Sequence, residues 1–253
     1  MTDPTSSPEA KAAAAQFLDA PAMAMIGILG GMSAASTLQY YELLCELTTE
    51  RLGGLHGPRL LIRSCDFAAI ARLQNEGAWA ALGERLAERA EDLEDGGAEV
   101  LLLATNTMHK VAPRMMRDVN IPLIHIADAA ADAILAGGFG HPGLIGTQFT
   151  MEDSFYLDRL RARGLQPIVP GAPDREIVHT VIYEELVQHK TLPESRAEFE
   201  RIVGELKRAG ADCVILGCTE VGLLLSPDNS VLPVFDTTRL HCEAAIDMAL
   251  KLG

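Results

Sequence analysis

The sequence has little positive charge and no long apolar run, and both shortages exclude classes of function. Its 21 Lys and Arg stand against 35 Asp and Glu, for a formal net charge of −14. Proteins that bind nucleic acids cluster their cations, and no such run occurs here, so we expect no nucleic-acid partner. The apolar runs are also much shorter than the roughly 20 residues of a transmembrane helix. We therefore expect no membrane partner either.

Metal and disulfide sites are not favoured, because the cysteines form no recognisable pattern. The five cysteines are an odd number, with no Cys-x-x-Cys pair and no Cys/His ligand spacing. Disulfide frameworks need paired cysteines, and zinc sites need clustered ones. We therefore predict no metal and a reducing, cytoplasmic location.

The first 24 residues lack the features of a signal peptide. They carry three acids, a single lysine and no long apolar core. We interpret residues 1–24 as an N-terminal tail, disordered over Thr2–Ser7 and with an optional short helix over Glu9–Leu18.

The rest of the chain alternates short apolar runs with amphipathic segments. This alternation is typical of βα units around a parallel sheet with helices on both faces. With 48% apolar residues, a chain of 253 residues can bury a large core. The predicted strands are Met25–Leu29, Leu60–Arg63, Glu99–Leu103, Leu123–Ile126, Gly143–Gly146, Pro167–Val169, Asp212–Leu216 and Leu232–Phe235.

Two segments of the chain read as copies of one strand and turn. Gly97–Thr107 and Gly210–Glu220 match at a constant offset of about 113 (218 minus 105), which places Thr105 opposite Cys218. Matching segments at one offset indicate an internal repeat. If two such units pack face to face, a hydroxyl and a thiol oppose each other across a cleft, as in an enzyme that moves a proton from one face of a carbon to the other.

The repeat predicts an α/β fold of two pseudo-symmetric Rossmann-like lobes, each a mainly parallel sheet flanked by helices. The helices predicted over Trp79–Glu94 and Glu198–Arg208 are related by the same offset. We expect residues 25–121 and 231–253 to form the first lobe and residues 122–230 the second. Ligands of parallel sheets bind beyond the carboxyl ends of the strands, so we place the active site in the interlobe cleft.

A glycine turn follows the first predicted strand. The spacing of Gly27, Gly30 and Gly31 is not Gly-x-Gly-x-x-Gly, and no acid ends a second strand at the ribose position. A dinucleotide site is therefore not favoured. The turn instead predicts backbone amides and the side chains of Met32 and Ser33 against a small ligand.

Cys218 lies where a buried strand should give way to a helix. Amide donors and the helix dipole there would favour its thiolate, with Thr219 as a possible cap. The alternative is a buried structural cysteine, which is our interpretation of the other four. The position of Cys218 at the mouth of the repeated strand favours the chemical role.

Thr105 precedes Asn106 and Thr107, where a threonine is ordinarily a helix cap. A cap would still leave its side chain at the cleft. Together with Thr219, these residues can supply the donors that hold a carboxylate at two helix N-termini. His109 is either a donor behind this site or a surface residue of the following helix.

Arg51 ends the first helix before a glycine loop, Leu52–His56. An arginine at a helix C-terminus is often only a solvated charge favoured by the dipole. A forked cation on a flexible loop could also select a second carboxylate on a substrate.

The motifs at Ile26–Ser33, Arg51–His56, Thr105–Lys110, Gly217–Glu220 and Leu232–Thr237 together resemble the aspartate/glutamate racemase family of the Asp/Glu/hydantoin racemase superfamily. The resemblance covers about Met25–Leu250. It implies two α/β lobes around one active site, usually in a homodimer, and an amino-acid substrate handled without pyridoxal phosphate or another cofactor.

Most members of that family use one cysteine per lobe as opposing acid and base. Thr105 in place of the first cysteine resembles the branch of L-aspartate/glutamate-specific and broad-specificity amino-acid racemases, and Cys218-Thr-Glu resembles the aspartate branch. By position, Asn106, Thr107 and Thr219 would bind the α-carboxylate and Arg51 the side-chain carboxylate. The substrate-binding residues implied in full are Met32, Ser33, Arg51, Asn106, Thr107, Thr147, Thr219 and Glu220.

The resulting hypothesis is racemisation by two bases. The Cys218 thiolate takes the α-proton of an L-amino acid, and the Thr105 hydroxyl, directly or through water, returns one on the opposite face. Two alternatives stay open: a decarboxylase of the same superfamily, which needs only one thiol, and a catalytically silent amino-acid sensor.

Overall fold

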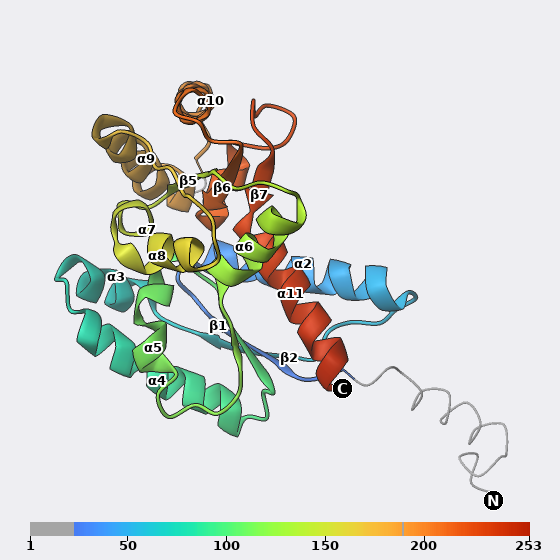
Figure 1. Cartoon of the computed structure of the whole chain (residues 1–253). Coiled ribbons are helices and arrows are strands. Elements are labelled where there is room, and N and C mark those ends of the chain that lie inside the picture. The colour runs from blue at the N-terminus through green and yellow to red at the C-terminus, as the bar shows by residue number, and fades with distance from the viewer. Residues whose placement is uncertain (1–22, 189) are drawn as a thin grey trace, which may run out of the picture.

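The computed structural model describes residues 23–188 and 190–253. The tail and short helix expected before residue 23 lie outside this part of the chain. The described residues form two parallel sheets, with strand orders β2-β1-β3-β4 and β5-β6-β7, which lie one above the other with helices around each (Figure 1). The predicted α/β fold of two mainly parallel sheets flanked by helices is confirmed.

The first sheet is covered on both faces because its inner strands are apolar on both faces. Its strands are β1 (Ile26–Gly30), β2 (Leu60–Ser64), β3 (Val100–Leu103) and β4 (Leu123–Ile124). Alternate β1 and β3 residues pack on α2 (Ala34–Leu52) and α11 (Thr237–Leu252). The residues between them pack on α3 (Phe67–Asn75), α4 (Trp79–Asp95), η2 (Thr107–Val111) and α5 (Ala112–Met115). Each face therefore has its own buried layer.

The second sheet follows the same plan. Its strands are β5 (Pro142–Gly146), β6 (Cys213–Gly217) and β7 (Val234–Asp236). One face packs on α9 (Ala172–Glu184) and α10 (Pro193–Arg208), with η4 (Thr219–Leu223) at its edge. The other face packs on α6 (Ile126–Ala136) and α8 (Ser154–Ala162). The remaining elements are α7 (Gln148–Glu152) and η3 (Leu186–Gln188).

The strands next to the two expected lobe boundaries, at residues 121/122 and 230/231, belong to other sheets than expected. β4 pairs with β3 and so extends the first sheet, whereas β7 pairs with β6 and so extends the second. Only α11 returns to the first lobe, where it packs on α2. The strand expected over Pro167–Val169 is reduced to a single bridge between Ile168 and Gly143.

The internal repeat is visible in the backbone. Gly97 and Gly210 follow the two long helices α4 and α10 with positive φ angles of 93° and 100°. The next residue donates to the carbonyl of a residue in the last helical turn, from Ala98 to Leu93 and from Ala211 to Leu206, both at 3.0 Å. This glycine helix stop leads into β3 in one copy and β6 in the other.

The two repeated strands end differently from the prediction in one respect. Each runs into a short 3₁₀ helix, η2 or η4, rather than directly into an α-helix. Neither 3₁₀ helix has a side-chain cap, so the capping roles considered for Thr105 and Thr219 are wrong. Among the residues with described structure, no helix has both the length and the apolar character that a membrane crossing requires.

Gly31 allows the turn after β1, and its replacement by alanine should destabilise the protein. Its φ is +82°, and an added Cβ would lie 2.4 Å from backbone atoms of Cys65. The left-handed conformation alone costs an L residue roughly 1–2 kcal/mol, and the clash adds to it. We expect Gly31→Ala to lower the free energy of unfolding by about 2–4 kcal/mol, measured by urea titration.

Gly57→Ala is the matched control, because an added Cβ at Gly57 meets nothing within 4 Å. Similar unfolding midpoints for the two variants would contradict this role of Gly31.

Candidate functional site

A cavity lies between the lobes, where β3 and β6 end. It is lined by Met32, Phe67, Gln74, Thr105, Asn106, Thr107, Met108, Thr147, Ile182, Tyr183, Val187, Gly217, Cys218, Thr219 and Glu220. Eight of the ten residues predicted for the site are among them. The other two, Ser33 and Arg51, do not line the cavity. The repeat therefore brings Thr105 and Cys218 to one cavity, as its symmetry predicted.

Cys218 is a buried thiol with a carboxylate beside it. Its side chain is 9% exposed, and Sγ donates to Oε2 of Glu220 at 3.0 Å. Burial and the Glu220 carboxylate raise the pKa of the thiol well above its ordinary value, and backbone N–H groups of Glu220 and Val221 lower it by less. The amide donors expected at this position are thus present, but the resting side chain is a thiol and not the expected thiolate.

Glu220 connects the two lobes at the cavity wall. Besides the Cys218 thiol, its carboxylate accepts from the hydroxyl of Thr219 and, through Oε1, from the hydroxyl of Ser33 at 2.7 Å. Ser33 also caps α2, because its Oγ accepts from the backbone N–H of Ser36. Ser33 therefore acts behind the cavity wall, by holding Glu220, and the cap fixes its position.

If this arrangement sets the state of the thiol, Glu220→Gln should lower the pKa of Cys218. The variant removes the neighbouring negative charge, which is second only to burial among the causes that raise this pKa. We expect iodoacetamide to alkylate Cys218 several-fold faster at pH 8, with the site identified by mass spectrometry. Glu88→Gln, an exposed position on α4, is the control. An unchanged or slower alkylation rate in Glu220→Gln would count against the arrangement.

Thr105 is held by His109 through its backbone. The Thr105 carbonyl accepts from Nδ1 of His109 at 2.8 Å, so Nδ1 carries the proton. Nε2 then accepts from the backbone N–H of Ile126 at 3.3 Å. His109 is 2% exposed, and of the two roles considered for it, the donor behind the site is confirmed.

His109 belongs to a cluster of three buried histidines, together with His125 and His241. Their ring centroids lie 4.4 Å and 5.7 Å from that of His109. His241 donates from Nε2 to the Ile124 carbonyl at 2.7 Å, and its Nδ1 accepts from the Tyr40 hydroxyl at 2.7 Å. Burial lowers the pKa of His125 and that of His241 to about 3, and lowers that of His109 well below its ordinary value.

Asn106 presents a free acceptor. Its Nδ2 donates to Oγ1 of Thr237 at 3.1 Å, and Thr237 in turn donates to the Leu216 carbonyl at 2.7 Å. Because the single hydroxyl proton of Thr237 goes to that carbonyl, Thr237 can only accept from Asn106, and this fixes the orientation of the amide. Oδ1 of Asn106 is then buried without a partner, which suits a substrate group that donates.

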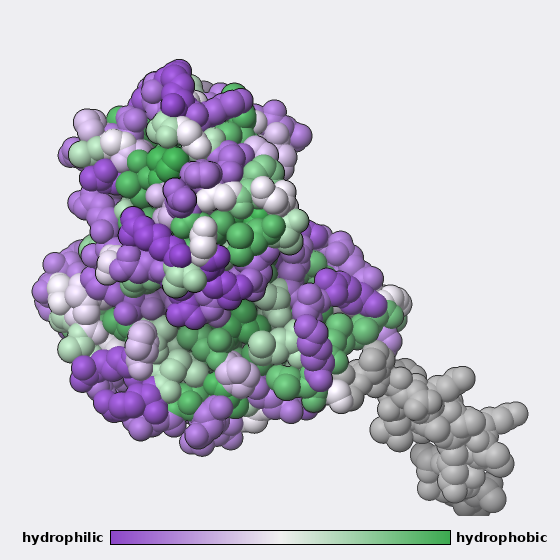
Figure 2. All heavy atoms as spheres, in the orientation of Figure 1, coloured by the Kyte–Doolittle hydropathy of each residue, from purple (hydrophilic) through white to green (hydrophobic). Residues whose placement is uncertain are grey.

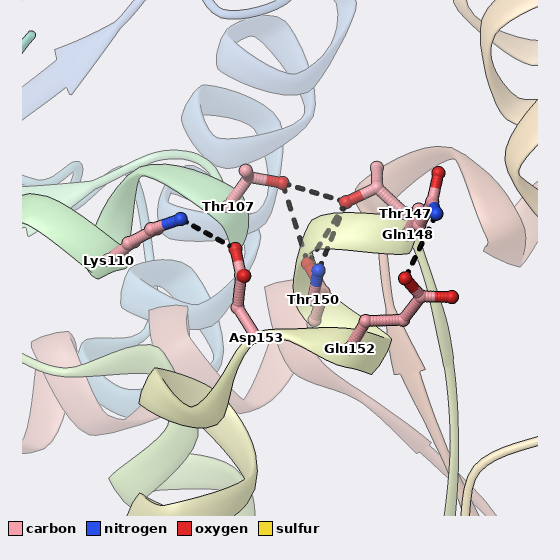
Figure 3. Close-up of polar contacts among 7 residues, drawn as sticks. All are labelled: Thr107, Lys110, Thr147, Gln148, Thr150, Glu152 and Asp153. Atoms are coloured by element: carbon pink, nitrogen blue, oxygen red, sulfur yellow. Dashed lines mark hydrogen bonds and ion pairs between the residues drawn. The ribbon is translucent and has the colours of Figure 1, made fainter. Parts of the chain in front are cut away.

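Hydroxyls and one ion pair join η2 of the first lobe to α7 and the residues on either side of it in the second (Figure 3). Oγ1 of Thr107 lies 3.0 Å from that of Thr147 and 3.5 Å from that of Thr150. Lys110 donates to Asp153 at 2.8 Å. Its ammonium also lies 3.8 Å from the ring centroid of Trp79.

Arg51 lies away from the cavity. It ends α2, and its guanidinium pairs with Asp247 of α11, both side chains being nearly half exposed. The glycine loop behind it has positive φ at Gly53 and Gly54. Arg51 does not line the cavity, and its role toward a substrate carboxylate stays a prediction.

Gln74 and Tyr183 are lining residues that the sequence did not reveal. Nε2 of Gln74 on α3 donates to the hydroxyl of Tyr183 on α9 at 3.0 Å, so this pair also bridges the lobes. Gln74 is 4% exposed. The only sequence signal is weak: Gln74 is a polar residue within an amphipathic helix. Nothing in the sequence near Tyr183 marks it. Within residues 23–188 and 190–253, no three His, Cys, Asp or Glu side chains gather as a metal-binding group would.

Comparison with known proteins identifies the family. The model of the Asp/Glu/hydantoin racemase family matches residues 29–245. A candidate Asp/Glu racemase from Yersinia pestis is 41% identical in sequence, with a TM-score of 0.85 over 90% of this chain and 100% of that one. An aspartate racemase homologue from Pyrococcus horikoshii is 34% identical, with a TM-score of 0.79 over 90% and 99%.

Among curated proteins, the broad-specificity amino-acid racemase RacX of Bacillus subtilis is 22% identical over 89% of this chain and 98% of its own. The family match spans both lobes and every element that lines the cavity. The chain belongs to the Asp/Glu/hydantoin racemase family.

Proposed function

We propose that this protein is a cofactor-independent racemase of L-amino acids, with Cys218 and Thr105 as the two groups that exchange the α-proton. One observation carries the assignment of the pair: equivalent positions after the repeated strands β3 and β6 both line one buried cavity. Two proton-transfer groups on opposite lobes are what a 1,1-proton transfer needs. The relatives named as aspartate and broad-specificity racemases agree with the reaction class.

The first step we propose is activation of the thiol. The Sγ–H proton of Cys218 passes along the 3.0 Å hydrogen bond to Oε2 of Glu220, which leaves a thiolate and a carboxylic acid. The thiolate then takes the α-proton of the L-substrate and becomes a thiol again. In this step Glu220 is the general base that accepts the thiol proton when substrate is bound, whereas in the free protein its negative charge raises the pKa of the thiol.

The second step returns a proton on the opposite face. The Thr105 hydroxyl donates its proton to the carbanion, or relays one from water. Solvent then restores the Thr105 hydroxyl and takes the proton from Glu220, which returns the site to its starting state. The α-ammonium of the substrate is a suitable partner for the free Oδ1 of Asn106, in place of the α-carboxylate role that the resemblance implied. The hydroxyl of Thr219 already donates to Glu220, so the proposed donors to the α-carboxylate are Thr107 and the backbone N–H of Thr219. Burial of the site strengthens each of these interactions.

The two faces differ in basicity. A hydroxyl is a much poorer base than a thiolate, so abstraction that starts from Thr105 should be slower than abstraction by Cys218. We propose that turnover starting from L-substrates is faster than turnover starting from D-substrates. The equilibrium between enantiomers remains one to one, so the asymmetry lies in rates and binding.

Exchange with deuterated solvent tests the proposed function. Purified protein without added cofactor should place deuterium at the α-carbon of L-amino acids and form the D-enantiomer, followed by proton NMR and chiral chromatography. Binding of amino acids without any α-exchange would support the sensor alternative instead. Release of carbon dioxide from an arylmalonate, again without α-exchange, would support the decarboxylase.

A homodimer is part of the proposal. Large apolar side chains on α2 are exposed, Leu38 at 58% and Tyr41 at 48%, and hydrophobic patches interrupt the hydrophilic surface on both halves of the face in Figure 2. Exposed apolar patches of this kind are common at protein contacts. Light scattering of the purified protein measures its mass in solution.

A further inference from the structure

We infer that the cavity selects amino acids with an uncharged side chain, and that the Gln74–Tyr183 pair recognises a side-chain amide or hydroxyl. This inference rests on the proposed function and names its substrate class. It differs from the aspartate or glutamate preference that the resemblance implied. Three observations support it: the apolar lining, the polar pair, and the sign of the buried charge.

Apolar side chains from both lobes form much of the lining. Met32, Phe67 and Met108 come from the first lobe, and Ile182 and Val187 from the second. Met32 and Met108 are 8% and 2% exposed, so little water reaches them. Such a lining favours the methylene groups of a substrate side chain and penalises the desolvation of a charge.

The polar pair interrupts this lining. Gln74 donates to the Tyr183 hydroxyl across the lobes at 3.0 Å, so the hydroxyl keeps its own proton to donate, and the Gln74 amide keeps its carbonyl oxygen to accept. One donor and one acceptor complement a carboxamide or a hydroxyl. Burial raises the pKa of Tyr183 and the hydrogen bond from Gln74 lowers it by less, so the phenol is neutral at physiological pH.

The charge at the cavity has the wrong sign for an acidic side chain. Of the described residues that line the cavity, Glu220 is the one with a charged side chain. Its charge is negative, and the residue is only 8% exposed. A side-chain carboxylate would add a further negative charge to those of Glu220 and the substrate's own α-carboxylate in this low-dielectric space, and it would be repelled. The cation predicted for such a group, Arg51, is paired with Asp247 outside the cavity.

A substrate panel tests the inference. Initial rates of α-deuterium exchange are measured for L-glutamine, L-asparagine, L-methionine, L-aspartate and L-glutamate. We expect kcat/KM for the best uncharged substrate to exceed that for either acid at least tenfold, which corresponds to about 1.4 kcal/mol. Faster exchange with an acid would overturn the inference and leave the proposed racemase intact. No exchange with any amino acid would overturn both.

Variants separate recognition by the pair from a structural role. Tyr183→Phe removes one oxygen and should raise KM for glutamine at least several-fold, with little change of KM for methionine. Tyr41→Phe, on the exposed surface of α2, is the matched control. Equal effects of Tyr183→Phe on both substrates would overturn the role of the pair. Thermal unfolding of both variants checks that each is folded.

Discussion

Cys218→Ser is expected to slow α-deuterium exchange of L-amino acids by about 10²–10⁴-fold, the range that a positioned acid or base contributes. The change keeps the size of the side chain but replaces a thiol by an alcohol, which Glu220 cannot deprotonate to a useful extent. Exchange is followed by proton NMR at saturating substrate. A proton can be returned on the opposite face only after Cys218 has removed the α-proton. Formation of the D-enantiomer should therefore fall by the same factor.

Cys45→Ser is the matched control for this loss. Cys45 lies on α2, is partly exposed and does not line the cavity, so the same chemical change there should leave exchange near the wild-type rate. If Cys218→Ser retained full exchange, the thiol would not be the base and the two-base assignment would fall. Thr105→Ala provides the complement, since it should depress turnover from D-substrates most.

Acidification should remove much of the stability of the folded protein between about pH 6 and pH 4. The histidines of the cluster, His109, His125 and His241, have pKa values in the folded state that burial lowers, for the last two to about 3. Unfolded histidines have a pKa near 6.5. Between these values the unfolded chain binds more protons than the folded chain, so the free energy of unfolding falls as the pH falls.

The size of this effect follows from the number of groups. Each histidine contributes a slope of about 1.4 kcal/mol per pH unit at pH values between its folded and its unfolded pKa, and typical domains have only about 5–15 kcal/mol of stability. The contribution is fully present above pH 6.5 and is lost progressively toward the pKa of the folded state. Urea titrations at pH 7, 5.5 and 4.5 measure the slope.

Substitution of one member tests the origin of the slope. His125→Asn removes a titrating group but keeps a side chain that can accept from the backbone N–H of Ala127, as His125 does at the start of α6. We expect a smaller change of stability with pH than in the wild type. His56→Asn, on the exposed loop after α2, is the control. A slope that falls equally in both variants would rule out the cluster as its source.

The fold could be predicted from the sequence where the signals are local. The apolar runs of β1, β3 and β6 are encoded within a few residues each, and the structure has these strands within one residue of the predicted bounds. The glycines that begin the two repeated segments, Gly97 and Gly210, prove to be helix stops. The sequence could not predict that β4 joins the first sheet and β7 the second. These strands have two and three residues, and pairing of such short strands is decided by the helices packed around them rather than by their own sequence.

The sequence predicts those parts of the candidate site that lie in the two repeated segments. Thr105 and Cys218 were found because one pattern marks both, and their neighbours in sequence followed. Gln74 and Tyr183 were not found, because their hydrogen bond joins residues 109 positions apart and each lies in an ordinary helix. The state of Cys218 was missed for a related reason: the sequence indicates the amide donors of the turn, whereas the depth of burial and the approach of Glu220 are tertiary properties.

Trp79 has a further consequence for experiments. It is the single tryptophan of the chain, and it lies at the seam between the lobes, with Lys110 over its ring and Phe149 of α7 at a centroid distance of 5.4 Å. Any opening of the lobes would change the surroundings of this one indole. The protein therefore carries an intrinsic fluorophore at the contact between its lobes, and a substrate whose binding alters that contact can be followed by stopped flow without a label.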